Sequence, residues 1–166
     1  MRPVYLVDGA RTPFLKARGV PGPFSASDLA LQAGRALLLR QPFLPRDLDE
    51  VILGCAAPAP DEVNIGRLVA LRLGCGERVP GFTVMRNCAS GLQALDTAAA
   101  NIRLGRSDLV LAGGTDALSR AAVLLSDPMV RWLARFRAAR SPRRSWVPWG
   151  ACPGATWRPK SVCSRG

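Results

Sequence analysis

Along residues 1–127, short apolar runs alternate with longer segments whose apolar residues recur at helical spacing. The apolar runs that resemble strands are 4–8, 50–57, 81–85 and 108–114. The segments that resemble helices are 28–40, 65–74 and 88–104. This alternation of strand and helix predicts an α/β domain with a mostly parallel sheet and helices on both of its faces.

Polar and small residues indicate where the predicted helices begin and end. Ser27 precedes the first helical segment, and Asn64 precedes the second, so each is a candidate N-cap. Gly74 and Gly105 follow the second and third helical segments and are candidate stop residues.

The pattern ends near residue 140, and the composition changes with it. Residues 1–127 contain fourteen Lys and Arg against twelve Asp and Glu, a net charge of +2. Residues 128–166 contain nine Lys and Arg, no acidic residue and all four tryptophans. We therefore expect one domain over residues 1–140, followed over 141–166 by a basic tail rich in Arg, Pro and Trp that is disordered or encoded out of frame.

Composition excludes several classes of protein. No run of eighteen apolar residues is present, which argues against a membrane span. The five cysteines form no CxxC pair, and the chain contains no histidine. A disulfide framework or a metal site is therefore not expected, and a reduced, cytoplasmic setting is the simplest interpretation.

Cys88 lies where the third predicted strand meets the third predicted helix. In parallel α/β sheets, reactive groups gather at the carboxyl ends of strands, and free N–H groups at a helix N-terminus favour a thiolate. The same groups can stabilise an oxyanion on an acyl group under attack, and the small Ala89, Ser90 and Gly91 leave room for it. On local physics alone, a buried core thiol is the favoured interpretation, because cysteine is among the residue types most often buried.

Three motifs widen the context of Cys88. They are VDGARTPF at 7–14, NCASGLQAL at 87–95 and LVLAGGTDALSR at 109–120. Together they resemble the N-terminal half of the thiolases, the family of acetyl-CoA acetyltransferases and 3-ketoacyl-CoA thiolases, over residues 3–140. The sequence departs from common family patterns at Met85, where asparagine is common, and at Asp116, where glutamate is common. The related ketoacyl synthases share the fold, but these motifs favour thiolase.

The resemblance implies that Cys88 is the nucleophile that accepts an acyl group. Acyl-CoA and coenzyme A would be substrates, no cofactor would be bound permanently, and full-length relatives would be homo-oligomers. The reaction implied is thiolysis of a 3-ketoacyl-CoA, as in fatty acid metabolism, or the reverse condensation.

The histidines and the second cysteine that complete this chemistry belong to the second half of the family's chain. The sequence has no histidine, and Cys152 and Cys163 do not match the family's CxG motif. The expectation is an incomplete half of the thiolase fold, truncated by a change of reading frame near 141–145 and inactive alone.

Other features have simpler interpretations. Cys55 and Cys75 are expected in the core or at the surface, Arg11 and Thr12 in a surface loop, and Asp8 in a turn. Gly113 and Gly114 suggest a tight turn more than phosphate binding. The alternative function is nucleic-acid binding by the basic tail, preceded by a basic helix through Arg131 and Arg135.

Overall fold

A computed structural model of the protein describes residues 2–16 and 19–138. The chain divides into two units, Met1–Ala122 and Val123–Gly166, and each is considered by itself. The predicted tail, 141–166, lies outside the described residues. Its boundary with the domain therefore stays a prediction.

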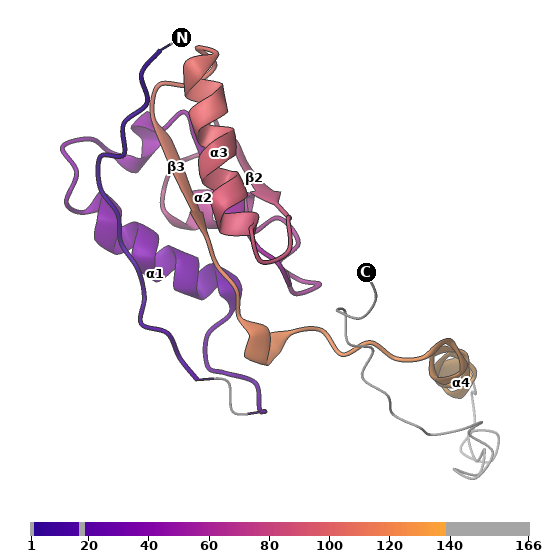
Figure 1. The fold of residues 1–166 in the computed structure, drawn as a ribbon. Helices are drawn as coiled ribbons and strands as arrows, with labels where there is room; N and C mark the ends of the chain where they lie inside the picture. Colours follow the sequence, from indigo (N-terminus) through magenta and orange to yellow (C-terminus); the bar gives the residue numbers. More distant parts are fainter. Residues whose placement is uncertain (1, 17–18, 139–166) are drawn as a thin grey trace. The chain divides into compact units, whose positions relative to one another are not determined.

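The first unit contains a parallel sheet of three strands (Figure 1). The strands are β1 (Glu50–Gly54), β2 (Gly81–Val84) and β3 (Val110–Gly114). Their order is β2-β1-β3, and Ile52 of β1 lies beside Phe82 of β2 and Ala112 of β3. Every residue of β1 is buried, as expected for a central strand with both faces covered. The predicted α/β class and parallel sheet are confirmed.

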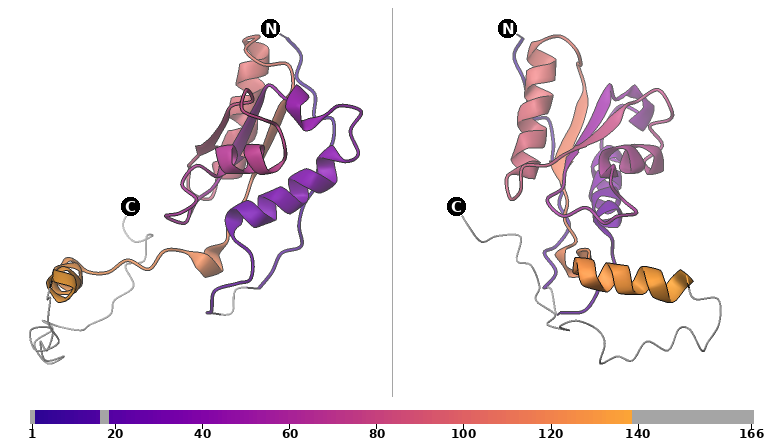
Figure 2. Two further views of the ribbon diagram at one scale, coloured as in Figure 1. Left: turned by 180° about the vertical axis from the view of Figure 1, so that it is seen from behind. Right: turned by 90° about the vertical axis from the view of Figure 1, so that its right-hand side faces the viewer.

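Helices cover both faces of this sheet (Figure 2). They are α1 (Ala26–Leu38), α2 (Ile65–Arg72) and α3 (Ser90–Arg103). Val51 and Leu53 belong to the same core cluster as the buried residues of α1 and α2, whereas Ile52 packs with Ala94 and Ala98 of α3. Alternate residues of β1 thus join the two halves of the core, because successive side chains of a strand point to opposite faces.

Ser25, not Ser27, is the N-cap of α1, so the predicted cap is wrong. The Ser25 hydroxyl accepts a hydrogen bond from the Asp28 amide at 3.2 Å, and the Asp28 carboxylate accepts one from the Ser25 amide at 3.1 Å. This capping box fixes the first turn. Ser27 is fully buried and donates its hydroxyl to Glu62 at 2.5 Å. Asn64 caps α2 as predicted, accepting from the Arg67 amide at 3.2 Å.

We expect Ser25→Ala to lower the free energy of unfolding by about 1 kcal/mol, because the Asp28 amide loses its acceptor at the start of α1. Urea denaturation followed by circular dichroism measures this change. Ser25→Asp is the matched control, since an aspartate at the N-cap also accepts from that amide, and it should retain most of the stability. Equal losses in the two variants would contradict a capping role.

The predicted strand at 4–8 is wrong. The segment is extended, but it forms no backbone–backbone hydrogen bond with any described residue and is not part of the sheet. Tyr5, Leu6 and Val7 are 76, 86 and 76% exposed. An apolar run of this length becomes a strand only where another strand pairs with it, and no described strand is hydrogen-bonded to it here.

In the second unit, α4 spans Asp127–Ala138, which confirms the predicted basic helix. The rings of Trp132 and Phe136 stack on one side of it, with centroids 5.6 Å apart. Whether this helix and the tail bind nucleic acid stays a prediction. Among the described residues, no helix has both the length and the apolar composition needed to cross a bilayer.

Candidate active site

Cys88 lies in the turn between β2 and α3 and is exposed. The neighbouring Asn87 has φ of 48°, the one positive φ outside glycine among the described residues. The Ser90 hydroxyl holds this turn, because it accepts from the Arg86 amide at 2.8 Å and donates to the Asn87 carbonyl at 2.7 Å. Ser90 is itself 2% exposed. The turn therefore leaves Cys88 exposed, while the hydrogen-bonded Ser90 that holds the turn is buried.

Backbone N–H groups remain free beside the cysteine. The N-cap of α3 is Ala89, whose side chain has no acceptor atom. The amides of Cys88, Gly91 and Leu92 donate to no acceptor among the described residues. Unpaired donors at the positive end of a helix dipole can bind an anionic oxygen, as the sequence predicts.

Two glycines at strand ends let the N-terminus of α3 approach the sheet closely. A Cβ on Gly54, the last residue of β1, would lie 2.2 Å from the carbonyl carbon of Ser90. A Cβ on Gly114, the last residue of β3, would lie 2.8 Å from the Cα of Gly91. These positions need glycine because another backbone passes too close for any side chain. The expectation of a tight turn at Gly113 and Gly114 is wrong, since both residues belong to β3.

A cavity of about 870 Å³ opens at this edge of the sheet and includes Cys88 in its lining. Gly54 and Gly114 contribute the strand ends, and the segments 10–16 and 20–24 form the outer wall. Arg11 and Thr12 are thus in the predicted loop, but that loop borders the cavity. Arg11 lies over the Phe14 ring, 4.4 Å from its centroid.

Asp116 stabilises the rim of the cavity, a role that the sequence did not predict. One carboxylate oxygen accepts from the amides of Ala56 and Ala57, each at 2.9 Å, and from the Cys55 thiol at 3.4 Å. The carboxylate therefore joins the segment after β3 to the segment after β1. Its place two residues beyond a strand end was the one available signal.

The other predicted residues have structural positions. Cys55 and Cys75 are buried in the core between the sheet and α1 with α2, as expected. Burial, and then the negative charge of Asp116, raises the pKa of Cys55 to about 12. Burial also raises the pKa of Cys75.

Asp8 accepts from the Gly9 amide at 2.7 Å and also from Arg40 and Gln41 beyond α1, but no turn forms at this position, so the predicted turn is wrong. The Gly9 amide and then the Arg40 guanidinium lower the pKa of Asp8. Asp8 therefore anchors the N-terminal segment to the end of α1.

The cavity combines an exposed thiol with free N–H donors, and among the residues that the structure describes its other ionisable lining residues are Arg11, Lys16 and Asp116. This arrangement has a nucleophile and donors for a developing oxyanion. The charged nitrogens of Arg11 and Lys16 add positive charge to the outer wall.

Residues 4–140 match the family described as "Thiolase, N-terminal domain". The chain is 42% identical over 127 residues to the 3-oxoadipyl-CoA/3-oxo-5,6-dehydrosuberyl-CoA thiolase of Escherichia coli (strain K12). The aligned region covers 75% of this chain and 32% of the relative. It is 37% identical over 135 residues to the acetyl-CoA acetyltransferase of Candida albicans, covering 81% of this chain and 33% of the relative.

The fold is also similar to the crystal structure of human mitochondrial 3-ketoacyl-CoA thiolase, with a TM-score of 0.67 and 31% identity. That similarity covers 72% of this chain and 31% of the human chain. The chain thus spans about a third of the length of the relatives that it matches. Because the family match covers most of the sequence, including the motif around Cys88, the chain belongs to the thiolase family.

Proposed function

We propose that the chain accepts an acyl group from acyl-CoA on Cys88, the acyl-transfer step of a thiolase. The observation that supports this most strongly is the position of Cys88. It is an exposed thiol at the carboxyl end of the sheet, inside a cavity and beside unpaired helix N–H groups. The names of the relatives, thiolases and acetyl-CoA acetyltransferases, agree with that chemistry.

In the proposed step, the Cys88 thiolate attacks the carbonyl carbon of an acyl thioester. The carbonyl electrons move onto oxygen, to which the unpaired amides of Cys88 and Gly91 would donate in this proposal. Collapse of the tetrahedral species breaks the bond to the sulfur of coenzyme A, which leaves as a thiolate and takes a proton from water. The acyl group remains on Cys88 as a thioester. Attack of a second coenzyme A thiol would reverse the transfer.

The sequence supplies a nucleophile but no histidine to act as its base. Asp116 is engaged with the amides of Ala56 and Ala57, so its carboxylate has a structural role. We therefore propose acylation of Cys88 as the activity of this chain. A complete thiolysis or condensation would also require a general base at the site, and we do not assign it to these residues.

Incubation of the protein with acetyl-CoA is expected to add one acetyl group to the peptide that contains Cys88. The reason is that the thiol is open to the cavity while the other described cysteines are buried. Mass spectrometry after proteolysis measures the adduct, and hydroxylamine should remove it as it removes any thioester.

The matched control is Cys88→Ala, which removes the sulfur at an exposed position and should leave the fold intact. The adduct should be absent from that variant. Acetylation in the variant to the same extent, or acetylation of lysine alone in the native chain, would contradict the proposed role of Cys88.

A further inference from the structure

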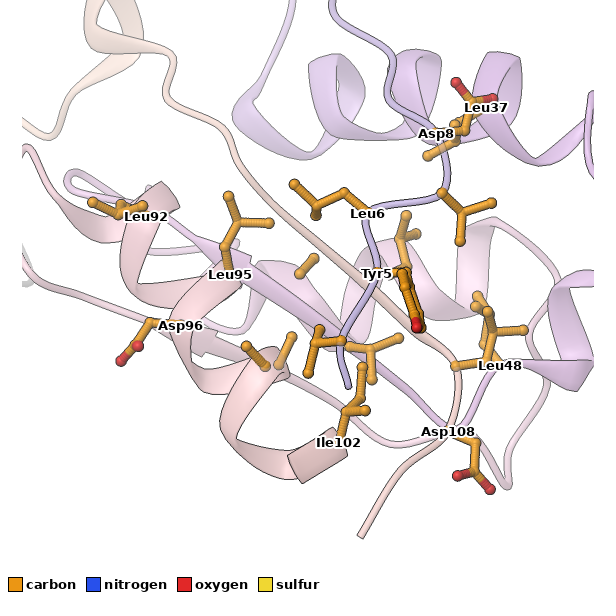
Figure 3. A pocket seen from close by; sticks show the side chains of 18 of the residues that line it. Tyr5, Leu6, Asp8, Leu37, Leu48, Leu92, Leu95, Asp96, Ile102 and Asp108 are labelled. Atoms are coloured by element: carbon orange, nitrogen blue, oxygen red, sulfur yellow. The ribbon is translucent and has the colours of Figure 1, made fainter. Parts of the chain in front are cut away.

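Exposed apolar side chains gather in both units of the chain. In the first unit, Leu6 and Leu95 line a groove of about 980 Å³ between residues 4–8, α3 and β3 (Figure 3). The charged residues that line this groove include both signs, such as Asp96 and Arg103, so charge does not identify what covers it. The second unit differs, because every charged residue after Asp127 is an arginine or a lysine.

The large apolar residues of α4 form a stripe along the helix. Its members occupy positions i, i+3, i+4 and i+7, which lie on one face of a helix, and they are Met129, Trp132, Leu133 and Phe136. The stacked rings of Trp132 and Phe136, inclined by 15°, agree with this placement. Among the described residues of α4 none is buried, and Phe136 is 46% exposed. The stripe is therefore not part of a core.

The arginines of α4 lie outside this stripe. At about 100° per residue, Arg135 and Arg137 border the stripe on its two sides, and Arg131 lies on the opposite face of the helix. Against these three arginines the helix carries one acidic residue, Asp127, in its first turn. Arginines at the edges of an apolar stripe can extend their charged ends to phosphate groups while the apolar side chains enter a bilayer.

The segment before α4 is also apolar and exposed. Val123, Leu124 and Leu125 are 73, 68 and 47% exposed. Single exposed apolar residues are common on protein surfaces, but a run of three large ones next to an exposed apolar stripe indicates a surface that contacts another apolar phase.

A helix with aromatic and aliphatic residues on one face and arginines around them is typical of segments that lie in the interface of a bilayer. We propose that α4 and residues 123–125 bind the surface of an anionic phospholipid bilayer. The stripe enters the acyl-chain boundary, and Arg135 and Arg137 contact lipid phosphates. Residues 139–166 add six Lys and Arg and no acidic residue to the attraction.

The length of α4 determines how it would lie on the membrane. At about 1.5 Å per residue, its twelve residues span about 18 Å, well short of a hydrocarbon core of about 30 Å. The helix would therefore lie along the surface of the bilayer and not cross it.

A nucleic acid is the other anionic partner that this charge would suit. Contacts to nucleic-acid phosphates use charged and polar side chains, so they account for the arginines. They give no role to Met129 and Leu133, which a bilayer removes from water. The separation of apolar and basic residues around α4 therefore favours the bilayer.

Sedimentation of the full chain with lipid vesicles tests the proposal. We expect at least about tenfold tighter binding to vesicles of phosphatidylcholine mixed with an equal amount of phosphatidylglycerol than to vesicles of phosphatidylcholine alone. Helix content measured by circular dichroism should rise on binding, because a helix of this length is marginally stable by itself in water.

Two neighbouring positions of α4 supply matched variants. Leu133→Gln changes the stripe, whereas Ala134→Gln changes the opposite face, and neither alters the net charge. Leu133→Gln should weaken binding to the mixed vesicles about tenfold, because the bilayer no longer receives a leucine side chain. Ala134→Gln should bind as the native chain does. Since α4 contributes no buried residue, both variants should keep the native urea denaturation midpoint.

Equal binding by the two variants would overturn the proposal, because the stripe would then not enter the bilayer. Failure of the native chain to bind the mixed vesicles would also overturn it. Binding of a labelled oligonucleotide by a chain that binds no vesicle would replace the bilayer with a nucleic acid. Cys88→Ala protein should bind vesicles as the native chain does, so these results are separate from the test of acyl transfer.

Discussion

Gly54→Ala is expected to lower the free energy of unfolding by about 3 kcal/mol or more, a large fraction of the roughly 5–15 kcal/mol that is typical of native domains. The added Cβ would lie 2.2 Å from both the carbonyl carbon and the carbonyl oxygen of Ser90, and 2.6 Å from the Gly91 nitrogen. All three atoms belong to the backbone of the first turn of α3, so no side chain can rotate to relieve the contact. Urea denaturation measures the loss.

The neighbouring strand offers a matched control. Gly113 is paired with Leu53 in the register of the sheet, and a Cβ on it would meet its nearest neighbour, the Leu53 Cδ2, at 3.9 Å. That distance is an ordinary contact, so Gly113→Ala should change the free energy of unfolding by less than about 1 kcal/mol. Equal denaturation midpoints for the Gly54 and Gly113 variants would contradict the close approach of α3 to β1.

The consequence for the site is direct, because α3 carries the turn that presents Cys88. Where Gly54→Ala protein remains folded, α3 must move away from the end of β1. We expect acetylation of Cys88 to fall in that fraction, because the free amides and the thiol would no longer keep their relative positions. Gly113→Ala should be acetylated as the native chain is.

The elements predicted from the sequence are those whose signals are local. The helical spacing of 28–40, 65–74 and 88–104 was sufficient to predict α1, α2 and α3, although α1 begins at Ala26. The central strands were equally visible as apolar runs. Segment 4–8 has the same kind of run but no pairing partner, and pairing is a property of the neighbour, which a single run does not encode.

The site was predictable to the same extent. The join of a strand-like run and a helical segment was enough to place Cys88 at the N-terminus of α3. The contact of Gly54 with Ser90 and the hydrogen bonds that Asp116 accepts from Ala56 and Ala57 were not predicted, because they connect residues far apart in the sequence. Glycine and aspartate near strand ends have several common roles, so their identity alone does not select one.

The described thiols are expected to differ in reactivity by more than about 100-fold at pH 8, where iodoacetamide should modify Cys88 and spare Cys55 and Cys75. Cys88 is exposed, whereas Cys55 is 0% and Cys75 is 2% exposed. The pKa of about 12 leaves about one Cys55 thiol in ten thousand ionised at this pH, and the thiolate is the form that reacts. Peptide mapping measures each site separately.

The dependence on pH distinguishes ionisation from simple burial. If the Cys55 thiolate limits its modification, the rate at Cys55 should rise about tenfold for each pH unit between 8 and 10, because that range lies below its pKa of about 12. The unfolded chain ionises this thiol at lower pH than the folded chain does. Raising the pH above about 9 should therefore lower the free energy of unfolding, and more Cys55 should then be modified through unfolded molecules.

In guanidinium chloride all three thiols should react alike. Modification of Cys55 in the native state as fast as Cys88 would show that the hydrogen bonds that Asp116 accepts from Cys55, Ala56 and Ala57 open readily. That result would remove the difference between the thiols on which the assignment of Cys88 as the acyl acceptor depends.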